Sequence, residues 1–300
     1  MYFMIYSRQN NAQWNDRRCD PMGNLAVRRL PLRFELKNCI KDFWVFASNG
    51  GLSVEEMQII VPNGSAKLML YYEGKFTGRV GDHAFLLPEH KLFVLGVSDC
   101  PTIAEFDREK AFGCICVEFH PASAYRILAV PQHELRNTLV PFDELITPSA
   151  IRIMEGRMFM ASDPVQKAML LQEYLIEMLA RTENDAKFEY GVSAIWNSRG
   201  RISIAELSQD MGQTDRWLRA KFSERLGISP KAFASIVRFQ SCFQTLLRDK
   251  RGFLEDGQFY DFYYDQAHFS KEFKRFMGYP PSKYTALQNE VGEIIYFNGD

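Results

Sequence analysis

The sequence predicts an α+β protein of two domains. A mostly antiparallel β domain of the sandwich or barrel kind, with added helices, precedes an all-α domain with two helix-turn-helix units. Three observations carry this prediction. The 300 residues are ample for two domains, because domains most often hold roughly 100–150 residues. Short apolar runs bounded by turn signals fill the first half, and helix start and stop signals crowd the last third.

Composition favours a globular chain outside the membrane. Hydrophobic residues make up 46% of the sequence and charged residues 24%, which argues against wholesale disorder. No apolar run approaches the roughly 20 residues that cross a bilayer, and the apolar start, Met1 to Tyr6, is too short for a signal peptide. We therefore expect a cytoplasmic protein with no membrane partner. The six cysteines lack zinc-site spacing. We therefore expect the cysteines to be buried and to pack as small hydrophobic side chains.

The first half of the chain reads as a series of short strands. Turn signals recur at Asn49-Gly50-Gly51, Asn63-Gly64, Glu73-Gly74 and Gly81-Asp82. Between and after them lie apolar or aromatic runs at Met57 to Val61, Leu68 to Tyr72, Ala84 to Leu87, Leu92 to Val97 and Cys114 to Phe119. Such spacing without interleaved helices is typical of antiparallel sheets.

A helix is predicted to close this domain. Asp163 serves as the cap, Pro164 takes the first helical position, and the helix runs to about Arg181. The polar stretch that follows is a plausible hinge. We therefore divide the chain into a β-rich domain, a linker, a helical domain and a tail, at residues 1–181, 182–187, 188–288 and 289–300.

Capping signals place the helices of the second domain. Ser203 and Glu206 form a capping box, and Gly212 closes that short helix. Thr214 opens the next helix, which Gly227 ends, and two short helices this close together match helix-turn-helix spacing. A longer helix follows from Pro230 to about Arg248, and a last one runs from the cap at Asp265 to Gly278.

An internal repeat with an offset of 51 residues covers this domain. Two caps, two core pairs, two closing glycines and two prolines coincide. The matched pairs are Thr214 with Asp265, Leu218 with Phe269, Phe222 with Phe273, Gly227 with Gly278, Pro230 with Pro281, and Phe233 with Tyr284. Agreement at so many typed positions indicates a duplicated structural unit.

The faces opposite the two core pairs are small or basic. One stripe holds Arg216, Arg219, Ala220 and Ser223, and the other holds Ala267, Ser270, Lys271 and Lys274. Residues 201–285 contain 14 Lys and Arg against 10 Asp and Glu, a balance of +4. A solvated helix face usually mixes charge signs, whereas a helix in the major groove needs basic and small residues. The linking helix of about 19 residues would be about 28 Å long, close to the roughly 34 Å between successive major grooves.

These residues closely resemble the C-terminal DNA-binding domain of the AraC/XylS family of bacterial transcription regulators. The matching stretches are SIAELSQDMGQTDRWLRAKFSERLGISPKAFASIVRFQ and YYDQAHFSKEFKRFMGYPPSKY. The resemblance implies seven helices, double-stranded DNA as the partner, and base contacts from Arg216, Arg219, Ala220, Gln266, Ala267 and Lys271. Our candidates for phosphate contacts are Thr214, Lys221, Arg225, Arg238, His268, Lys274 and Arg275.

The first domain resembles, more faintly, the sensor domain that precedes AraC-type domains in some of these regulators. The likeness rests on Val61 to Gly64 with the run after it, and on Phe119-His120-Pro121 leading into Tyr125 to Leu128. The resemblance implies a small-molecule effector, a homodimer, or both, and RNA polymerase as a further partner of an activator. The effector-binding residues, the operator and the oligomeric state stay open.

One segment departs from the family pattern. The family usually has a glycine at the position of Phe262 and a small or apolar pair in place of Gly257-Gln258. Within Leu254 to Phe262, Gly257 would cost roughly 1 kcal/mol in a helix interior, and Asp261 falls where a core residue is expected. The first helix of the second unit is therefore predicted to be poorly formed.

Motifs for catalysis or cofactors are missing from the sequence. It contains no GxSxG, P-loop or GxGxxG motif, so we expect no enzyme, no catalytic residue, no cofactor and no metal. His83 and His90, near Glu89, are the only histidine pair to check. The aromatic residues Phe43, Trp44, Phe46, Tyr71 and Tyr72 are expected to pack in the core, or to line a pocket if one exists.

The function predicted from the sequence is sequence-specific, effector-responsive regulation of transcription. Two alternatives stay open. One is an interaction protein whose degenerate second unit has lost specific DNA binding. The other is an N-terminal enzyme fused to a DNA-binding module, which the missing motifs disfavour.

Overall fold

The structure is a computed structural model. It describes residues 25–50, 57–105, 107, 109–146, 148–161, 163–179, 184–248 and 252–284. The tail predicted at 289–300, Cys19, Met1 to Tyr6 and residues 182–183 of the predicted linker lie outside the described residues. No helix in the described part of the chain is long and apolar enough to cross a bilayer.

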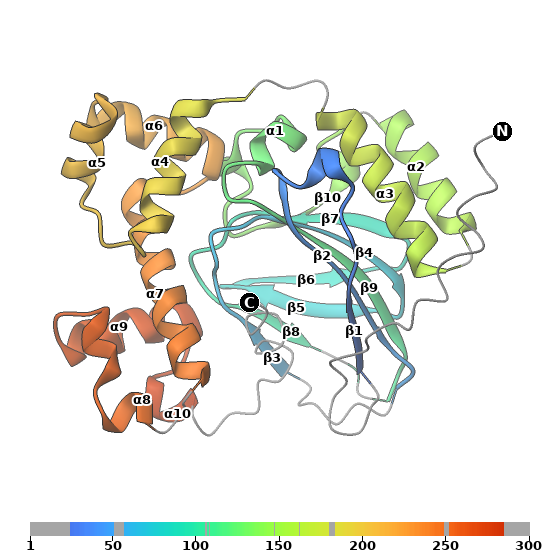
Figure 1. The fold of residues 1–300 in the computed structure, drawn as a ribbon. Coiled ribbons are helices and arrows are strands. Elements are labelled where there is room, and N and C mark those ends of the chain that lie inside the picture. The colour runs from blue at the N-terminus through green and yellow to red at the C-terminus, as the bar shows by residue number, and fades with distance from the viewer. Residues whose placement is uncertain are drawn as a thin grey trace.

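The N-terminal part is built on two antiparallel sheets (Figure 1). The six-stranded sheet has the order β1 (Leu25–Arg29), β2 (Ile40–Ser48), β9 (Phe112–Phe119), β4 (Lys67–Glu73), β7 (Lys91–Leu95) and β10 (Leu139–Pro141). The four-stranded sheet has the order β3 (Met57–Ile60), β8 (Thr102–Glu105), β5 (Phe76–Val80) and β6 (His83–Leu87). The predicted antiparallel β domain is confirmed.

All five predicted strands form, as β3, β4, β6, β7 and β9, with ends shifted by one or two residues. The sequence did not reveal β1, β2, β5, β8 and β10. Strand β2, which lies between β1 and β9, is buried on both faces over almost its whole length, so its apolar residues run together and do not alternate with polar ones.

The six-stranded sheet separates two cores. Along β4, Leu68 and Leu70 face the helices, whereas Lys67, Met69 and Tyr71 face the four-stranded sheet. This alternation follows from the two-residue period of a strand. The core between the two sheets is rich in aromatic residues and is described further below.

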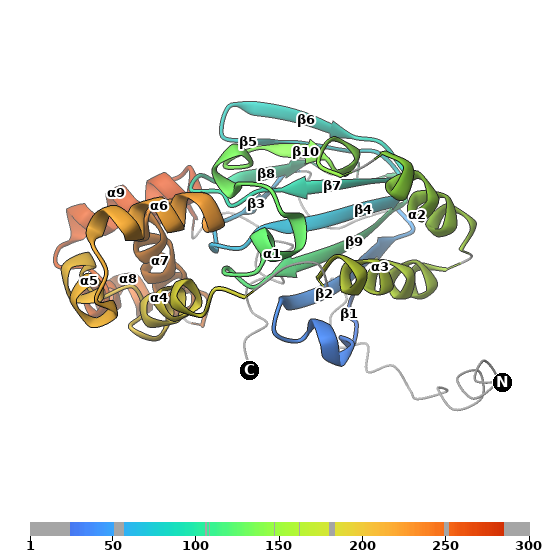
Figure 2. The same ribbon diagram turned by 90° about the horizontal axis from the view of Figure 1, so that it is seen from above.

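Three helices complete the N-terminal part: α1 (Ala124–Leu128), α2 (Pro148–Met160) and α3 (Pro164–Leu179). Short 3-10 turns occur at η1 (Phe34–Leu36), η2 (Gln132–Glu134) and η3 (Phe142–Glu144). The predicted cap of α3 is confirmed, because an Asp163 Oδ1 atom accepts hydrogen bonds from the backbone N–H groups of Val165 and Gln166 at 2.8 and 2.9 Å. Figure 2 shows α2 and α3 beside the sheet, away from the C-terminal helices.

The C-terminal part is helical over its described residues, 184–248 and 252–284. Its elements are α4 (Ala186–Asn197), α5 (Ile204–Met211), α6 (Asp215–Leu226), α7 (Pro230–Arg248), α8 (Gly252–Glu255), η4 (Gln258–Asp261), α9 (Gln266–Met277) and α10 (Pro281–Tyr284). The predicted capping box of Ser203 and Glu206 is present. Thr214 and Asp265 cap α6 and α9 through their side chains, as predicted.

The internal repeat appears as matching helices. Both α6 and α9 have 12 residues and begin and end at positions 51 apart. Pro230 begins α7 and Pro281 begins α10, again 51 apart. The match does not extend to the segments that precede α6 and α9: α5 is one regular helix, whereas its counterpart is divided into α8 and η4.

The two parts pack closely against each other. Residues of the sheet, of α1 to α3 and of the C-terminal helices belong to one contiguous buried cluster. Gln240 of α7 donates a hydrogen bond to the carbonyl oxygen of Pro62 at 2.5 Å. At the end of α6, Gly227 has φ +89°, and a Cβ there would lie 2.6 Å from the carbonyl oxygen of Gln132. Only glycine therefore permits this approach of α6 to η2.

Candidate nucleic-acid interface

The first predicted recognition helix, α6, presents its predicted base-reading residues to solvent. Its apolar face, with Leu218 and Phe222, is fully buried. Arg216, Arg219 and Ala220 are exposed on the other side. The helix is thus oriented by its own core pair, and the small residue Ala220, which follows Arg219, leaves room for close approach to a groove.

An acidic residue also reaches this face. Asp215 lies one turn before Arg219, and a carboxylate oxygen of Asp215 accepts a hydrogen bond from the Nε atom of Arg219 at 2.9 Å. The sequence analysis missed this residue because it considered the stripe at i, i+3 and i+4 alone. The pair fixes the direction of the Arg219 guanidinium group, while 71% of the Arg219 side chain remains exposed.

The second predicted recognition helix, α9, has the same construction. Phe269 and Phe273 are buried. Gln266, Ala267 and Lys271 are exposed. Asp265 caps the helix by accepting a hydrogen bond from the backbone N–H of His268 at 2.7 Å. The three predicted base-reading residues of α9 thus lie together on one open face near its N-terminus.

The two recognition helices are placed on the same side of α7. Figure 1 shows α6 and α9 near opposite ends of α7, and Figure 2 shows both on one side of it. The observed α7 has 19 residues, which gives about 28 Å at 1.5 Å per residue. The C-terminal ends of both recognition helices adjoin the β domain, at Gln132 for Gly227 and at Pro101 for Gly278. Their N-terminal ends are therefore the free ends.

Four of the predicted phosphate-contacting residues lie at or near this open face. Thr214, His268 and Lys274 are exposed. Lys221 is half-buried and forms an ion pair with Glu224 on the same helix at 3.1 Å.

The three other predicted phosphate contacts are engaged within the protein. Arg225 forms an ion pair with Asp185 at 3.2 Å and lies over the ring of Tyr125. Arg238 forms an ion pair with Glu272 at 3.1 Å. About a fifth of each of these two side chains is exposed. We leave Arg225 and Arg238 out of the proposed interface because their guanidinium groups already bind internal carboxylates.

Arg275 connects the second unit to the β domain. Its guanidinium group donates a hydrogen bond to Asp99 at 2.8 Å, and Arg136 donates to the same carboxylate oxygen at 2.8 Å. Asn137 donates to the other oxygen. Burial alone would raise the pKa of Asp99, but the hydrogen bonds from Asn137 and Arg136 and the positive charges outweigh it, so this pKa lies below its ordinary value.

The other sequence candidates separate into core and cavity residues. The structure does not combine His83 and His90 into a metal site, and no group of three or more His, Cys, Asp or Glu side chains within the described residues could hold a metal ion. His90 packs instead against the ring of Phe159. Of the five aromatic residues singled out, Phe43 lies in the helix-facing core and Tyr72 packs against it, while Trp44, Phe46 and Tyr71 line a cavity between the sheets.

Comparison with known proteins gives one family match. Residues 28–141 match the model of a domain of unknown function, DUF6597. No curated protein matches the chain.

Solved structures similar to this chain include transcription regulators. Wild-type ToxT from Vibrio cholerae strain SCE256, bound to an unsaturated fatty acid, is 11% identical; the match covers 83% of this chain and 96% of ToxT, with a TM-score of 0.47. ToxT from Vibrio cholerae O395 is 12% identical over 85% of this chain and 100% of ToxT, with a TM-score of 0.44. A cupin domain of an XRE family transcriptional regulator from Enterobacter cloacae is 12% identical over 33% of this chain and 98% of that domain, with a TM-score of 0.27.

The structure has the two-part organisation that the sequence predicts. An antiparallel β domain comes first and an all-helical domain second. The helical domain contains the two capped helices α6 and α9 and the long linking helix α7 that the motifs predict.

Proposed function

We propose that this protein is a sequence-specific DNA-binding regulator of transcription that responds to a small effector. One observation carries the proposal: two matched helices present small and basic residues from their free N-terminal ends on one side of a rigid linking helix. In helix-turn-helix proteins the N-terminal residues of the recognition helix contact base edges.

The two units would read two successive major-groove segments. Arg216 and Arg219 would contact bases in one segment, and Gln266 with Lys271 in the next. The length of α7, about 28 Å, together with the helices packed near its two ends, supports the spacing of roughly 34 Å that successive grooves require. Ala220 and Ala267 would leave room for the backbone to approach.

The proposed assembly contains further partners. The β domain would bind the effector and pair two chains into a homodimer, and the DNA-bound protein would contact RNA polymerase as an activator. The boundaries predicted at 181 and 188 would separate these two roles. Arg136 and Arg275, which meet at Asp99 and are both about half exposed, lie where phosphates beside the second unit would pass.

Selection of bound genomic fragments by the full-length protein tests the proposal. The selected site is expected to bind much more tightly than unrelated DNA, and its affinity should fall steeply with salt because phosphates are neutralised. Arg216→Ala should weaken binding to that site. Lys187→Ala is the matched control, because Lys187 is an exposed residue at the start of α4. Equal affinity for all fragments would contradict the proposal.

The irregular second unit favours one alternative function, that of an interaction protein without specific DNA binding. Division of its first helix into α8 and η4 would favour an interaction protein if α9 did not dock on DNA. Lys271→Ala decides between them. An unchanged affinity and an unchanged footprint would mean that α9 does not read DNA.

A further inference from the structure

A groove between the helices α1, α2 and α3 is large enough to hold a small molecule. Its volume is about 500 Å³, and small-molecule sites usually occupy roughly 300–1,000 Å³. The groove lies on the helix-covered side of the six-stranded sheet, whereas the cavity between the sheets, of about 70 Å³, lies on the other side. Of these two separate spaces, the groove is the one with room for a ligand.

The wall of the groove is almost entirely apolar. Ten of its thirteen lining residues are aliphatic, methionine or tyrosine. Ile127, Leu128 and Met154 are buried in the protein core, whereas 67% of Ile153 remains exposed. Met154 and Met178 both line the groove, and methionine side chains adapt to irregular apolar shapes. Exposed apolar surface of this extent is typical of a binding site, and an apolar body in the groove would remove it from water.

The rim of the groove has a surplus of negative charge. Its three charged residues are Glu173 and Glu177 of α3 and Arg157 of α2, all exposed or partly exposed. Arg157 and Glu173 form an ion pair at 3.5 Å, whereas Glu177 has no ion-pair partner among the described residues. The last turn of α3 contains no basic residue, so the negative end of the helix dipole adds to the charge of Glu177.

This combination favours a lipophilic cation over other small molecules. Glu177 would repel an anion, and a neutral apolar molecule would gain nothing from the charged rim. A primary ammonium ion is strongly hydrated, and the apolar wall could not replace the water that it loses. Tyr174 lies between the two glutamates in the sequence of α3 and also lines the groove, and an aromatic ring attracts a cation that lies over its face.

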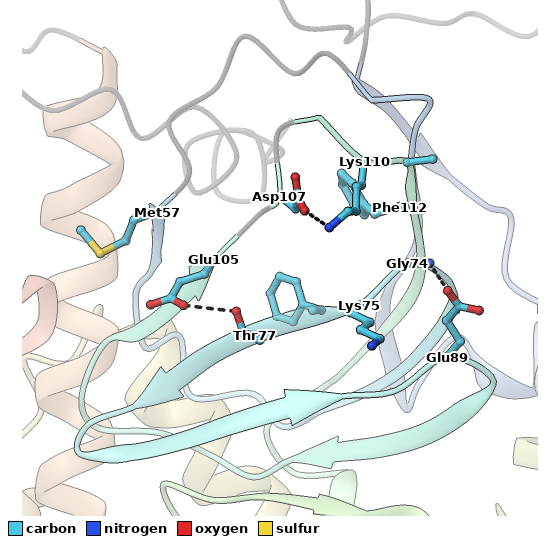
Figure 3. A pocket seen from close by; sticks show the side chains of 11 residues that line it. Met57, Gly74, Lys75, Thr77, Glu89, Glu105, Asp107, Lys110 and Phe112 are labelled. Atoms are coloured by element: carbon cyan, nitrogen blue, oxygen red, sulfur yellow. Dashed lines mark hydrogen bonds and ion pairs between the residues drawn. The ribbon is translucent and has the colours of Figure 1, made fainter.

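The larger hollow at one end of the two sheets is a poorer match for such a ligand. Its volume is about 790 Å³, but charged and polar side chains make up much of its wall. Figure 3 shows that each of its three carboxylates already binds a neighbouring donor. The pairs are Asp107 with Lys110, Glu105 with Thr77, and Glu89 with the backbone N–H of Gly74. The carboxylates of this hollow are thus satisfied by the protein itself.

Helix α1 lies between the groove and the first helix-turn-helix unit. Figures 1 and 2 both show it with α2 and α3 on one side and the C-terminal helices on the other. Leu128 of α1 lines the groove. The ring of Tyr125 in the same helix lies under the guanidinium group of Arg225 in α6, at 4.8 Å. Arg126 forms an ion pair with Glu189 of α4 at 3.7 Å. A shift of α1 would therefore move contacts that support α4 and α6.

We propose that the groove between α1, α2 and α3 is a binding site for lipophilic organic cations. The apolar wall surrounds the body of the ion, and Glu177 and Tyr174 attract its charge. The consequence of binding rests on the proposed function: the bound cation displaces α1 and so changes the support of α6 on DNA. Binding itself does not depend on DNA.

Calorimetry on the full chain without DNA tests the site. The probes are the tetraphenylphosphonium ion and the tetraphenylborate ion, which have nearly the same size and shape but opposite charges. The phosphonium ion should bind about tenfold more tightly, because the rim attracts one ion and repels the other, by about threefold each. Glu177→Gln should weaken binding of the phosphonium ion about threefold and strengthen binding of the borate ion by a similar factor, so that the preference nearly disappears.

Two further variants locate the bound ion. Met178→Trp narrows the groove and should weaken binding of both ions. Glu105→Gln, at the larger hollow, is the matched control for Glu177→Gln and should leave both affinities unchanged.

The link to the first unit is tested by measuring DNA affinity with and without the bound phosphonium ion. The affinity should change by about fivefold or more in the wild type. Tyr125→Leu should bind the ion as the wild type does but show a smaller change in DNA affinity, because the ring beneath Arg225 is lost.

The inference is wrong if neither ion binds, if both bind equally, or if Glu177→Gln leaves the preference intact. A preference lost in Glu105→Gln would place the cation in the larger hollow and would also contradict it. If no probe binds and Ile153→Ser converts a dimer into monomers, a second copy of the chain occupies the groove instead. An unchanged DNA affinity would refute the link through α1, whereas a chain that binds the phosphonium ion but no DNA would refute the proposed function and leave the site standing.

Discussion

The two helix-turn-helix units present similar recognition helices but support them differently. In the first unit, α5 is a regular helix with a complete capping box, and α6 packs on η2 and α1 of the β domain. In the second unit, the corresponding segment is divided at Gly257, which has φ +68°. Here α9 is supported by aromatic packing and by ion pairs that involve Glu272 and Arg275.

This difference shows that aromatic side-chain packing can support α9 where the preceding segment is not a regular helix. Phe269 of α9 contacts the rings of Phe253 in α8 and Phe259 in η4, at 5.8 and 4.9 Å between ring centres. Leu218, at the matching position of the first unit, is aliphatic and makes no ring–ring contacts. The second unit thus compensates for a broken helix with aromatic contacts, and it should depend more on tertiary structure than the first.

The largest expected effect comes from removing that packing. Phe269→Ala should lower the free energy of unfolding by about 3–5 kcal/mol, and hydrogen exchange should show that α8 and η4 lose protection together with α9. Leu218→Ala is the matched change in the first unit. In this variant α5 should keep its protection from hydrogen exchange and lose it only when the whole domain unfolds. Urea denaturation of both variants checks the magnitudes. A loss below 2 kcal/mol for Phe269→Ala would mean that other contacts hold the second unit.

The two units can next be compared on DNA. Arg219→Ala should weaken specific binding by about 1–3 kcal/mol and relax the preference at one base position, as expected for a base-reading side chain. Lys271→Ala should have a similar but smaller effect at the other half of the site, because the second unit is less regular. Selection from randomised sites measures both. Uniform weakening on every sequence would assign the residue to a phosphate.

Gly257 offers a test in which the sign of the effect matters. Sequence analysis placed Gly257 in a helix interior, where alanine would stabilise the protein by roughly 1 kcal/mol. In the structure its φ is +68° and a Cβ would lie 3.1 Å from the ring of Tyr260. Gly257→Ala should therefore destabilise by about 1–2 kcal/mol. Gly156→Ala, in the middle of α2 with nothing near its Cβ position, is the control and should stabilise slightly.

Local signals decided which features the sequence could predict. Caps and stop glycines act within one helical turn, so α5, α6, α7 and α9 were predicted almost to the residue. Buried strands such as β2 give no alternation and were missed. The partners of Arg225 and Arg238 were also unpredictable, because Asp185 and Glu272 come close only through tertiary packing. The same holds for the groove between α1, α2 and α3, which exists only once these helices pack together.

The smallest expected effect concerns the ion pair that ties the second unit to the β domain. At the repeat position of Arg275 the first unit has Glu224, which pairs within its own helix. The contact with Asp99 is thus specific to the second unit. The folded-state pKa of Asp99 is lowered, so its stabilising effect is complete above the ordinary pKa of an aspartate, about 3.9, and is lost as the pH falls through the lower folded-state value.

Urea denaturation at several pH values measures this dependence. The free energy of unfolding of the wild type should exceed that of Asp99→Asn by a constant amount between pH 7 and about pH 5. Below the ordinary pKa of an aspartate, the two free energies should converge. Asp82→Asn is the control, because Asp82 is exposed and should give no gap at any pH. Hydrogen exchange should place the loss at α9 and leave α6 protected. A gap that widened toward low pH would contradict the sign derived from the lowered pKa, and equal loosening of α6 and α9 would show that Asp99 stabilises both units alike.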